Sequence, residues 1–343
     1  RLSASFRDPS GFVFSHDGFI YRQVNTRYAS EYEQLMTSGL YDALTEKQWL
    51  IRHEAVQDPS VSAGPDAYKL LRPEQIPYIS YPYEWCFSQL KDAALLTLKI
   101  AAKALQHDMI LKDASAYNVQ FVGSRPLFID TLSFAPYVEG EPWIAYRQFC
   151  QHFLAPLALM AHVDVSVAKL LVTQIDGIPL HIASRLLPLK TRLKSGLFSH
   201  LHLHAKTQQR FADFAKETTA NQVESRKPRI SKKALRAILE SLAVTINTLQ
   251  WRPPKTEWGE YYAHTNYSSD AADDKANVLR QFLESIASPL NTIHDLGANT
   301  GVYSEVAAAH CVYVVSQDID PIAVEAQYQK RRATGPNNIL PLL

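Results

Sequence analysis

The sequence has few cysteines, no long apolar run and no excess of charge of either sign, and each absence excludes a class of protein. Its three cysteines, Cys86, Cys150 and Cys311, are far apart, odd in number and without the spacing of metal ligands. Such cysteines are typical of reduced, packed thiols rather than of a secreted disulfide framework. We therefore expect a cytoplasmic protein.

No apolar run reaches the length that crosses a bilayer, and the N-terminus lacks the apolar core of a signal peptide. Lys and Arg number 35 against 34 Asp and Glu, so the formal net charge is +1. A chain this close to neutral has no global attraction to nucleic acid or to an anionic membrane. We predict neither partner, and the sequence leaves the oligomeric state open. Hydrophobic residues make up 46% of the 343 residues, enough for cores in about two domains.

The stretch 292–321 carries the clearest functional pattern. It predicts a strand at Thr292–Leu296, a glycine turn from Gly297 to Gly301 and a helix at Val302–Ala309. A second strand at Val312–Val315 follows, with the acid Asp318 after it. This order is half of a nucleotide-binding α/β fold, and its ligand binds where the strands end.

The composition of the turn narrows the ligand class. A dinucleotide-binding turn has glycines where this chain has Asn299 and Val302. Gly297 lets the backbone leave the strand in a conformation that other residues resist. Asp295 stands directly before the turn, and Asp318 can accept both hydroxyls of a ribose. This wider, polar turn favours a ligand with a cationic amino-acid end over a pyrophosphate.

These residues resemble a known family. Asp295-Leu-Gly297-Ala-Asn299-Thr-Gly301, followed by Asp318-Ile319-Asp320-Pro321, is similar to the cofactor site of class I S-adenosylmethionine-dependent methyltransferases. The resemblance implies a Rossmann-like sheet and methyl transfer by in-line displacement. It implies a cofactor site made of Asp295, Gly297, Ala298, Asn299, Gly301, Asp318 and Ile319. In that family the turn holds the methionine end, the acid beside it orders the ammonium group, and the second acid binds the ribose. Ile319 would pack on the adenine, and no catalytic base can be named. The alternative interpretation is an ordinary βαβ turn with a capping aspartate.

The residues around this motif extend the expectation. A segment just upstream of such a core commonly folds over the cofactor, which makes Tyr262, Tyr267 and Lys275 candidate contacts. Downstream, the pattern predicts a helix at Pro321–Arg332 and a third strand at Ile339–Leu343. A sheet of this family has seven strands, with the acceptor site beyond the fourth. We therefore expect an incomplete sheet, further sequence after Leu343, and a small-molecule or modified-metabolite acceptor.

The N-terminal region contains a second group of polar residues. Asp-Gly at 17–18 predicts a hairpin within Gly11–Val24, followed by helices at Thr26–Glu54 and Asp92–Gln106. Asp113 and Asn118 then lie five residues apart, and Asp130 ends an apolar strand twelve residues later. Oxygen ligands of this kind suit magnesium and a phosphate, and an acid such as Asp113 can accept a proton from a hydroxyl.

This stretch resembles the catalytic loop of protein-kinase-like and aminoglycoside-phosphotransferase-like folds. The resemblance implies Asp113 as a base, Asn118 and Asp130 as metal ligands, and Mg-ATP as a cofactor. The chain departs from the pattern, with Leu111 in place of a histidine and Thr131-Leu132 in place of Phe-Gly. It also lacks a glycine-rich loop and a strand lysine upstream, although Arg22 on the hairpin is a substitute for the lysine. An active phosphotransferase and a degenerate binding module both remain open.

The middle of the chain is predicted to be helical. Pro142–Ala161 is apolar and aromatic, with a kink at Pro156 and too many polar residues for a membrane span. His200, His202 and His204 alternate, but without a fourth ligand they do not predict a metal site. The basic stretch 226–236 is typical of a solvated linker and helix start, or of a phosphate-binding patch.

We therefore predict an α/β protein whose C-terminal part is an incomplete Rossmann-like methyltransferase sheet. It has an α+β, kinase-like domain at 1–140, a helical subdomain with a basic linker at 141–250, and the methyltransferase part at 251–343. The order of the segments YNVQF, PLFIDTLSF, PWIAYRQFCQHFLAPL and TNY is also similar to bacterial nodulation-type methyltransferases. That similarity covers nearly the whole chain and implies no particular substrate.

Overall fold

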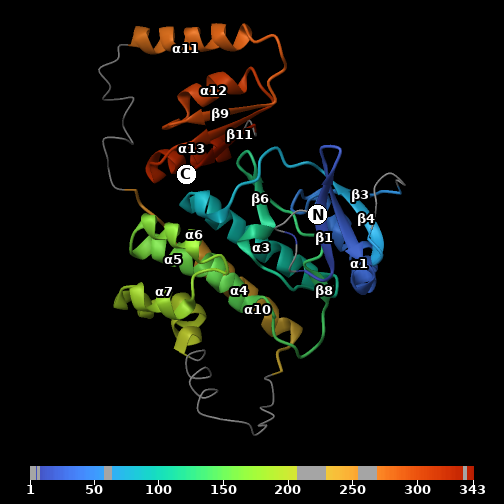
Figure 1. Ribbon diagram of the computed structural model, residues 1–343. Helices are drawn as coiled ribbons and strands as arrows, with labels where there is room; N and C mark the ends of the chain where they lie inside the picture. Colours follow the sequence, from blue (N-terminus) through green and yellow to red (C-terminus); the bar gives the residue numbers. More distant parts are fainter. Residues whose placement is uncertain (1–4, 6–7, 58–63, 207–228, 254–268, 335–337) are drawn as a thin grey trace.

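A computed structural model describes residues 5, 8–57, 64–206, 229–253, 269–334 and 338–343 of the protein. It shows three parts: an N-terminal sheet, a central region built mostly of helices, and a C-terminal unit of alternating strands and helices (Figure 1). The N-terminal sheet and the C-terminal unit both pack against the central region. No helix of the described residues is long and apolar enough to cross a membrane.

The N-terminal sheet begins with the expected hairpin. Strands β1 (Gly11–His16) and β2 (Phe19–Asn25) pair antiparallel, and Asp17 and Gly18 form the turn with φ of 48° and 80°. Strands β3 (His53–Ala55) and β4 (Ala67–Pro73) complete an antiparallel sheet with the order β1-β2-β4-β3. The hairpin prediction is confirmed.

The prediction that Thr26–Glu54 is helical throughout is wrong. The chain instead forms a 3-10 turn η1 (Thr26–Tyr28), helix α1 (Ala29–Thr37) and helix α2 (Leu40–Glu46), and residues 53–55 join the sheet. Gly39 separates the helices because its φ of 75° is left-handed and ends the first one. Tyr28, Tyr32 and Leu35 of this segment are all buried.

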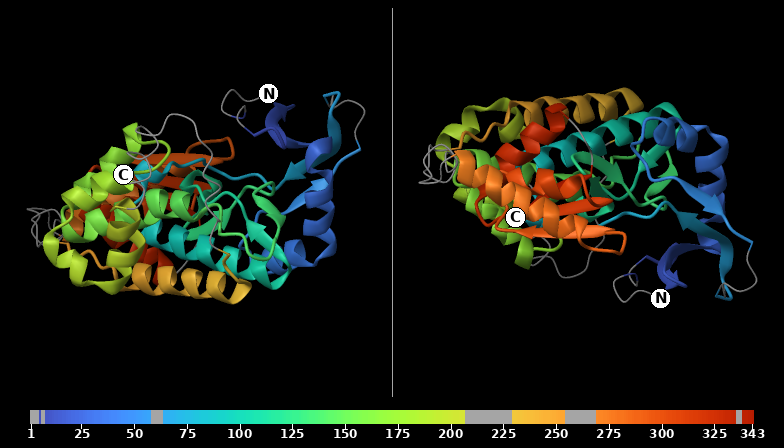
Figure 2. Two further views of the ribbon diagram at one scale, coloured as in Figure 1. Left: turned by 90° about the horizontal axis from the view of Figure 1, so that it is seen from below. Right: turned by 90° about the horizontal axis from the view of Figure 1, so that it is seen from above.

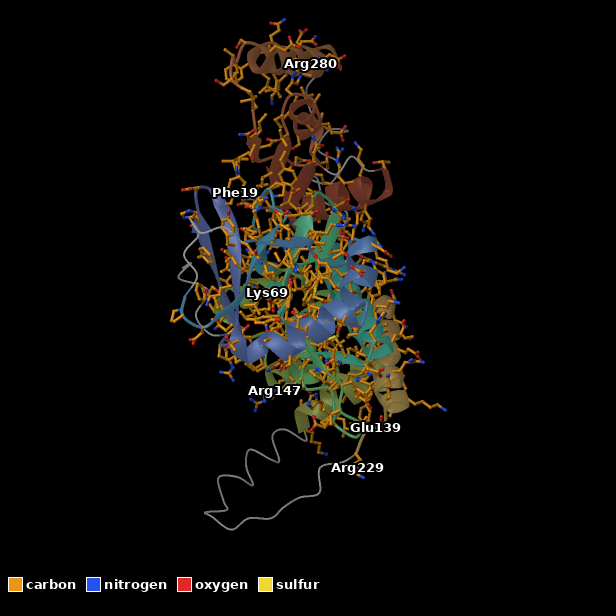
Figure 3. All side chains as sticks on the ribbon, turned by 90° about the vertical axis from the view of Figure 1, so that its right-hand side faces the viewer. Phe19, Lys69, Glu139, Arg147, Arg229 and Arg280 are labelled. Atoms are coloured by element: carbon orange, nitrogen blue, oxygen red, sulfur yellow. The ribbon has the colours of Figure 1, made fainter. Side chains whose placement is uncertain are left out.

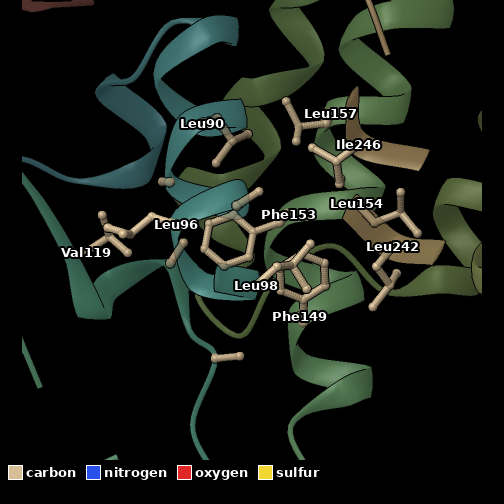
Figure 4. Packing of buried hydrophobic residues seen from close by; sticks show 14 of the residues in the cluster. Leu90, Leu96, Leu98, Val119, Phe149, Phe153, Leu154, Leu157, Leu242 and Ile246 are labelled. Atoms are coloured by element: carbon tan, nitrogen blue, oxygen red, sulfur yellow. The ribbon is translucent and has the colours of Figure 1, made fainter. Parts of the chain in front are cut away.

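Helix α3 (Phe87–Gln106) is the centre of the fold. It starts five residues before the predicted Asp92, because the side chain of Gln89 caps the backbone N–H of Cys86 at 3.0 Å. Around it lie the turns η2 (Pro82–Glu84) and η3 (Ala116–Asn118) and four short strands. Strand β5 (Met109–Leu111) pairs with β8 (Phe134–Pro136), and β6 (Val119–Val122) pairs with β7 (Arg125–Phe128). Leu90, Leu96 and Leu98 of α3 pack with Phe149 and Phe153 in the main core (Figure 4).

The helical region is more irregular than its sequence predicts. The stretch 146–162 forms α4 (Tyr146–Phe149), a π-helical turn η4 (Cys150–Leu154) and α5 (Ala155–His162), so the distortion lies just before Pro156. Several short elements follow: η5 (Val165–Lys169), α6 (Leu170–Thr173), α7 (Leu180–Leu186), η6 (Leu189–Leu193), α8 (Ser195–Leu197) and η7 (Phe198–Leu203). Helix α10 (Lys232–Thr248) then packs beside α3 (Figure 2).

The C-terminal unit has the element order that the sequence predicts. Its elements are α11 (Ser269–Glu284), β9 (Thr292–Leu296), α12 (Val302–Ala308), β10 (Tyr313–Gln317), α13 (Pro321–Thr334) and β11 (Ile339–Leu342). The strands are parallel, with the order β11-β10-β9. Because parallel strands end on one side, the segments after β9, β10 and β11 meet at a single edge of the sheet.

A buried interface joins the C-terminal unit to α3 and the β6–β7 hairpin. Glu325 of α13 is 3% exposed and accepts hydrogen bonds from the backbone N–H of Ser88, at 3.0 Å, and from its hydroxyl. Tyr328 donates to Asp92 at 2.9 Å or to the carbonyl of Ser124 at 3.0 Å. One apolar cluster extends from Leu35 in α1 to Leu342 in β11, so the parts share one core.

Candidate functional site

The glycine turn has the backbone shape that its residues predict. Gly297, Asn299 and Gly301 have φ of 77°, 50° and 79°, all in the left-handed region. A Cβ atom at Gly297 would meet nothing within 4 Å, so the turn is open on that side. A Cβ atom at Gly301 would instead collide with the side chain of Gln327. Gly297 therefore leaves the turn accessible to a ligand, whereas Gly301 allows α12 to pack closely on α13.

The carboxylate of Asp318 faces this turn. Its Oδ2 accepts a hydrogen bond from the backbone N–H of Asn299 at 2.7 Å, and its Oδ1 accepts one from the N–H of Asp320 at 2.9 Å. A carboxylate has about four acceptor positions. Asp318 therefore keeps capacity for two further donors while the backbone holds it in place.

The backbone N–H groups of the turn are engaged within the protein. Those of Gly297 and Ala298 donate to the carbonyl of Gln317, and that of Asn299 donates to Asp318. Those of Thr300 and Gly301 donate to the Asn299 side chain and to the carbonyl of Ala298. A phosphate-binding turn needs free N–H donors. From residue 297 to 301 this turn offers none, which agrees with the expectation that it does not bind a pyrophosphate.

A cavity of about 900 Å³ opens beside the turn at the ends of the strands. It is lined by Lys275, Leu296, Gly297, Asn299, Tyr303, Gln317, Asp318, Ile319, Asp320 and Leu343. This lining contains two carboxylates, those of Asp318 and Asp320, and one ammonium group, that of Lys275, so its net negative charge suits a ligand with a cationic end. The side chain of Ile319 is 97% exposed, and the buried Oδ2 of Asp320 has no hydrogen-bond partner among the described residues.

Three residues assigned by resemblance lie outside this lining. Asp295 accepts a hydrogen bond from the hydroxyl of Ser304 at 2.6 Å, and that hydroxyl lies 2.7 Å from Ser316. Ala298 is buried, and Gly301 faces α13. Asp295 thus uses one carboxylate oxygen to connect β9 to α12. That Asp295 also orders the ammonium group of a ligand stays a prediction.

The expected lid residues are only partly placed. Tyr262 and Tyr267 fall outside the described residues. Lys275 does line the cavity, with its ammonium group 4.4 Å from the ring centre of Tyr303. Sequence reasoning did not identify Tyr303, Asp320 or Leu343 as lining residues. Only the position of Tyr303, two residues after Gly301, could have pointed to it.

A second cavity, of about 440 Å³, brings together the residues of the kinase-like pattern. It is lined by Ser5, Asp8, Pro9, Gly11, Phe12, Arg22, Lys112, Asp113, Asn118, Asp130 and Leu132. Arg22 of β2 forms an ion pair with Asp130. The arginine therefore stands beside the predicted metal-binding acid, as expected of a substitute for the missing lysine.

The two acids of this cavity differ in their electrostatics. Burial alone would raise the pKa of Asp130, but the positive charge of Arg22 and the hydroxyl of Ser133 outweigh it and lower that pKa. Burial raises the pKa of Asp113, and the negative charge of Asp130 raises it further. Asp130 is therefore held as a carboxylate, while Asp113 is the better proton acceptor of the two.

The carboxylate oxygens of Asp130 already have partners. Arg22 contacts Oδ1, Ser133 donates to Oδ2, and the amide of Asn118 donates to the same serine hydroxyl at 3.2 Å. Within the described ranges no group of three or more His, Cys, Asp or Glu residues is arranged to hold a metal ion. A cation bound by Asp130 would have to share the carboxylate with Arg22 and Ser133.

Of the alternating histidines, His200 and His202 lie on the π-helical turn η7 and His204 follows it directly, so none of them lies on a strand. His200 lies 2.8 Å from Tyr146 and 2.8 Å from Ser241, and His202 lies 2.8 Å from Ser184 and 2.9 Å from Thr191. Burial lowers the pKa of both rings. They act as neutral hydrogen-bonding groups inside the helical region.

Fold and cavities together define a mixed helix-and-sheet protein in which one cavity lies at the ends of a parallel sheet and another lies beside the N-terminal sheet. No family model matches the sequence. Nodulation protein NoeA of Rhizobium meliloti (strain 1021) is 34% identical over 351 aligned residues, which span all of this chain and 71% of that protein. The chain therefore belongs to the NoeA family.

One solved structure, that of vaccinia related kinase 3, is similar at low level. The two sequences are 12% identical, the TM-score is 0.33, and the match covers 71% of this chain and 87% of the kinase chain. A TM-score of this size does not assign the fold.

Proposed function

We propose that the chain is an S-adenosylmethionine-dependent methyltransferase whose cofactor binds in the cavity beside the glycine turn. The observation that carries this proposal is the position of Asp318, which is hydrogen-bonded to the glycine turn and lines the cavity there, next to the exposed Ile319. The engaged N–H groups of the turn and the excess of carboxylates support a cationic ligand over a nucleotide diphosphate.

The residues present fit this cofactor. Asp318 would accept the ribose hydroxyls, Ile319 would cover the adenine, and Gly297 leaves room beside the main chain. When bound, the cofactor supplies a methyl group on a positively charged sulfur. The chain's own part is to bind and orient, and alignment of this kind contributes on the order of 7–11 kcal/mol to a displacement reaction. The acceptor is a small molecule or modified metabolite, and its identity is open.

Calorimetry with S-adenosylmethionine tests the proposal. Asp318→Ala removes hydrogen bonds to a charged group worth about 3 kcal/mol, so we expect binding to weaken roughly 100-fold. Asp274→Ala on α11 is the matched control, because Asp274 is exposed and outside the lining. Unfolding curves of both variants establish that the protein remains folded. Equal affinity of wild type and Asp318→Ala contradicts the assignment.

The second cavity supports a second candidate function, a magnesium-dependent phosphotransferase or a degenerate module that only binds a nucleotide. Asp113, Asn118 and Asp130 line one cavity with Arg22, which comes from the distant N-terminal hairpin. Calorimetry with ATP, with and without magnesium, distinguishes the two. Loss of magnesium-dependent binding in Asp130→Ala but not in Asp17→Asn, an exposed control on the hairpin turn, supports the phosphotransferase. The absence of any heat with ATP removes both.

A further inference from the structure

The helical region carries an exposed surface in which leucines and basic residues alternate. On η6 and the start of η7, Leu189, Leu193 and Phe198 are 73%, 89% and 46% exposed. Lys190, Arg192 and Lys194, which are interleaved with them, are also exposed. We call these six residues the basic-leucine surface. Large apolar side chains this exposed are unusual when they occur together.

This surface has an excess of positive charge. The sequence contains no Asp or Glu between Asp176 and Asp213. Among the described residues, none of the three basic side chains pairs with a carboxylate. The formal charge of +1 for the whole chain conceals this local excess, because acids elsewhere cancel it.

The scaffold beneath the surface holds η6 in place. Thr191 is fully buried, and its hydroxyl donates to the carbonyl of Pro188 at 2.7 Å. Because that hydroxyl has only one hydrogen, the ring of His202 must donate to it, at 2.9 Å, and must accept from Ser184 of α7 on its other nitrogen. Neutral His202 thus ties η6 to α7, and the neighbours of Thr191 in sequence point outward.

We propose that the basic-leucine surface binds an anionic phospholipid membrane. Leucines that protrude between basic side chains suit an interface in which the apolar groups enter the acyl boundary and the cations meet the headgroups. Two cavities include Lys194 in their lining, but Leu189, Leu193 and Phe198 line neither, so these cavities do not place a peptide partner against the apolar side chains of the surface. A single-stranded nucleic acid would need aromatic platforms, of which this surface has only Phe198. The surface lies at the opposite end of the molecule from α11 (Figure 1).

Vesicle flotation with the full chain tests this proposal. We expect binding to vesicles that contain about one third phosphatidylglycerol and at least tenfold weaker binding to pure phosphatidylcholine. Raising the salt from about 0.1 M to about 1 M shortens the screening length from about 10 Å to about 3 Å, so most of the binding should be lost.

A pair of matched double variants distinguishes binding by this surface from nonspecific binding by any exposed basic or apolar residue. Arg192→Glu with Leu193→Gln changes one basic and one apolar residue of the surface, and we expect at least a tenfold loss of vesicle binding. Arg280→Glu with Val312→Gln makes the same changes on exposed residues of the C-terminal unit, where Arg280 lies far from the surface (Figure 3), and should bind as wild type.

Circular dichroism melting curves show whether both double variants keep their fold. The proposal is overturned if the wild type does not bind anionic vesicles, which is the result expected when another part of the chain covers the surface. It is also overturned if the wild type binds neutral vesicles equally, if it prefers a single-stranded RNA probe, or if both double variants bind alike.

Discussion

The exposed side chain of Ile319 gives the sharpest test of the cofactor site. Because 97% of this side chain is accessible, Ile319→Ala removes almost no contact within the protein, and the free energy of unfolding should change by less than about 0.5 kcal/mol. Full burial of an isoleucine side chain contributes about 1.5–3 kcal/mol. An adenine ring covers one side only, so the loss on binding should be about 1 kcal/mol, or roughly fivefold in affinity.

The assay is calorimetry with S-adenosylmethionine, combined with urea unfolding of the same samples. Val312→Ala is the control, since Val312 is 68% exposed and does not line the cavity. Ile319→Asp places a third carboxylate between Asp318 and Asp320 and tests whether an apolar side chain is required. Its affinity should fall below that of Ile319→Ala. If Ile319→Ala binds as tightly as wild type, adenine does not pack on this residue. If it unfolds more easily, the isoleucine has a structural role that its exposure does not suggest.

Three further predictions concern stability. Glu325→Ala leaves the buried hydroxyl and amide of Ser88 without an acceptor, so the free energy of unfolding in urea titrations should fall by about 2–4 kcal/mol. A decrease below about 0.5 kcal/mol would show that the interface between α13 and α3 opens in solution. Arg22→Met leaves the carboxylate of Asp130 uncompensated and should cost about 3–5 kcal/mol, whereas an unchanged urea midpoint would mean that the ion pair is not formed. Burial, and then the charge of Arg22, lower the pKa of His53 to about 4. Its neutral form is favoured in the folded state, so its contribution is complete above pH about 6.5 and is lost as the pH falls towards 4. Urea unfolding at pH 7 and 5 should therefore show a smaller decrease in His53→Gln than in wild type, and equal decreases would contradict this pKa.

The C-terminal unit was predictable because its signals are local. Glycines with positive φ, a β-branched strand and a proline at the first helical position all lie within a few residues of the elements they define. The same holds for the hairpin turn at Asp17 and Gly18. The helical prediction over Thr26–Glu54 failed for one local reason and for one that is not local. Gly39 adopts a left-handed conformation, and His53 to Ala55 pair with a strand that comes later in the chain.

The candidate site was predictable to the same extent. Gly297, Asn299, Asp318 and Ile319 line the cavity because the motif fixes their backbone positions. The environment of Asp295 was not predictable, since its partner comes from the next helix. Tyr303 could have been inferred only from its position two residues after Gly301, and Leu343 carries no motif signal. The basic-leucine surface was missed for another reason, because net charge averages over the whole chain and does not show where charges gather.

The contacts of α13 with α3 have a consequence for how the protein can be handled. Glu325 and Tyr328 are buried against Ser88 and Asp92, so separating the chain near residue 251 would expose a carboxylate and a tyrosine to water on one piece and strip the apolar face of α3 on the other. Neither piece should express well alone. The distance between the two cavities should also stay constant, because a hinge motion between α13 and α3 would have to break these buried contacts. Exchange of the amide hydrogens of α3 and α13 should consequently occur in a single cooperative event.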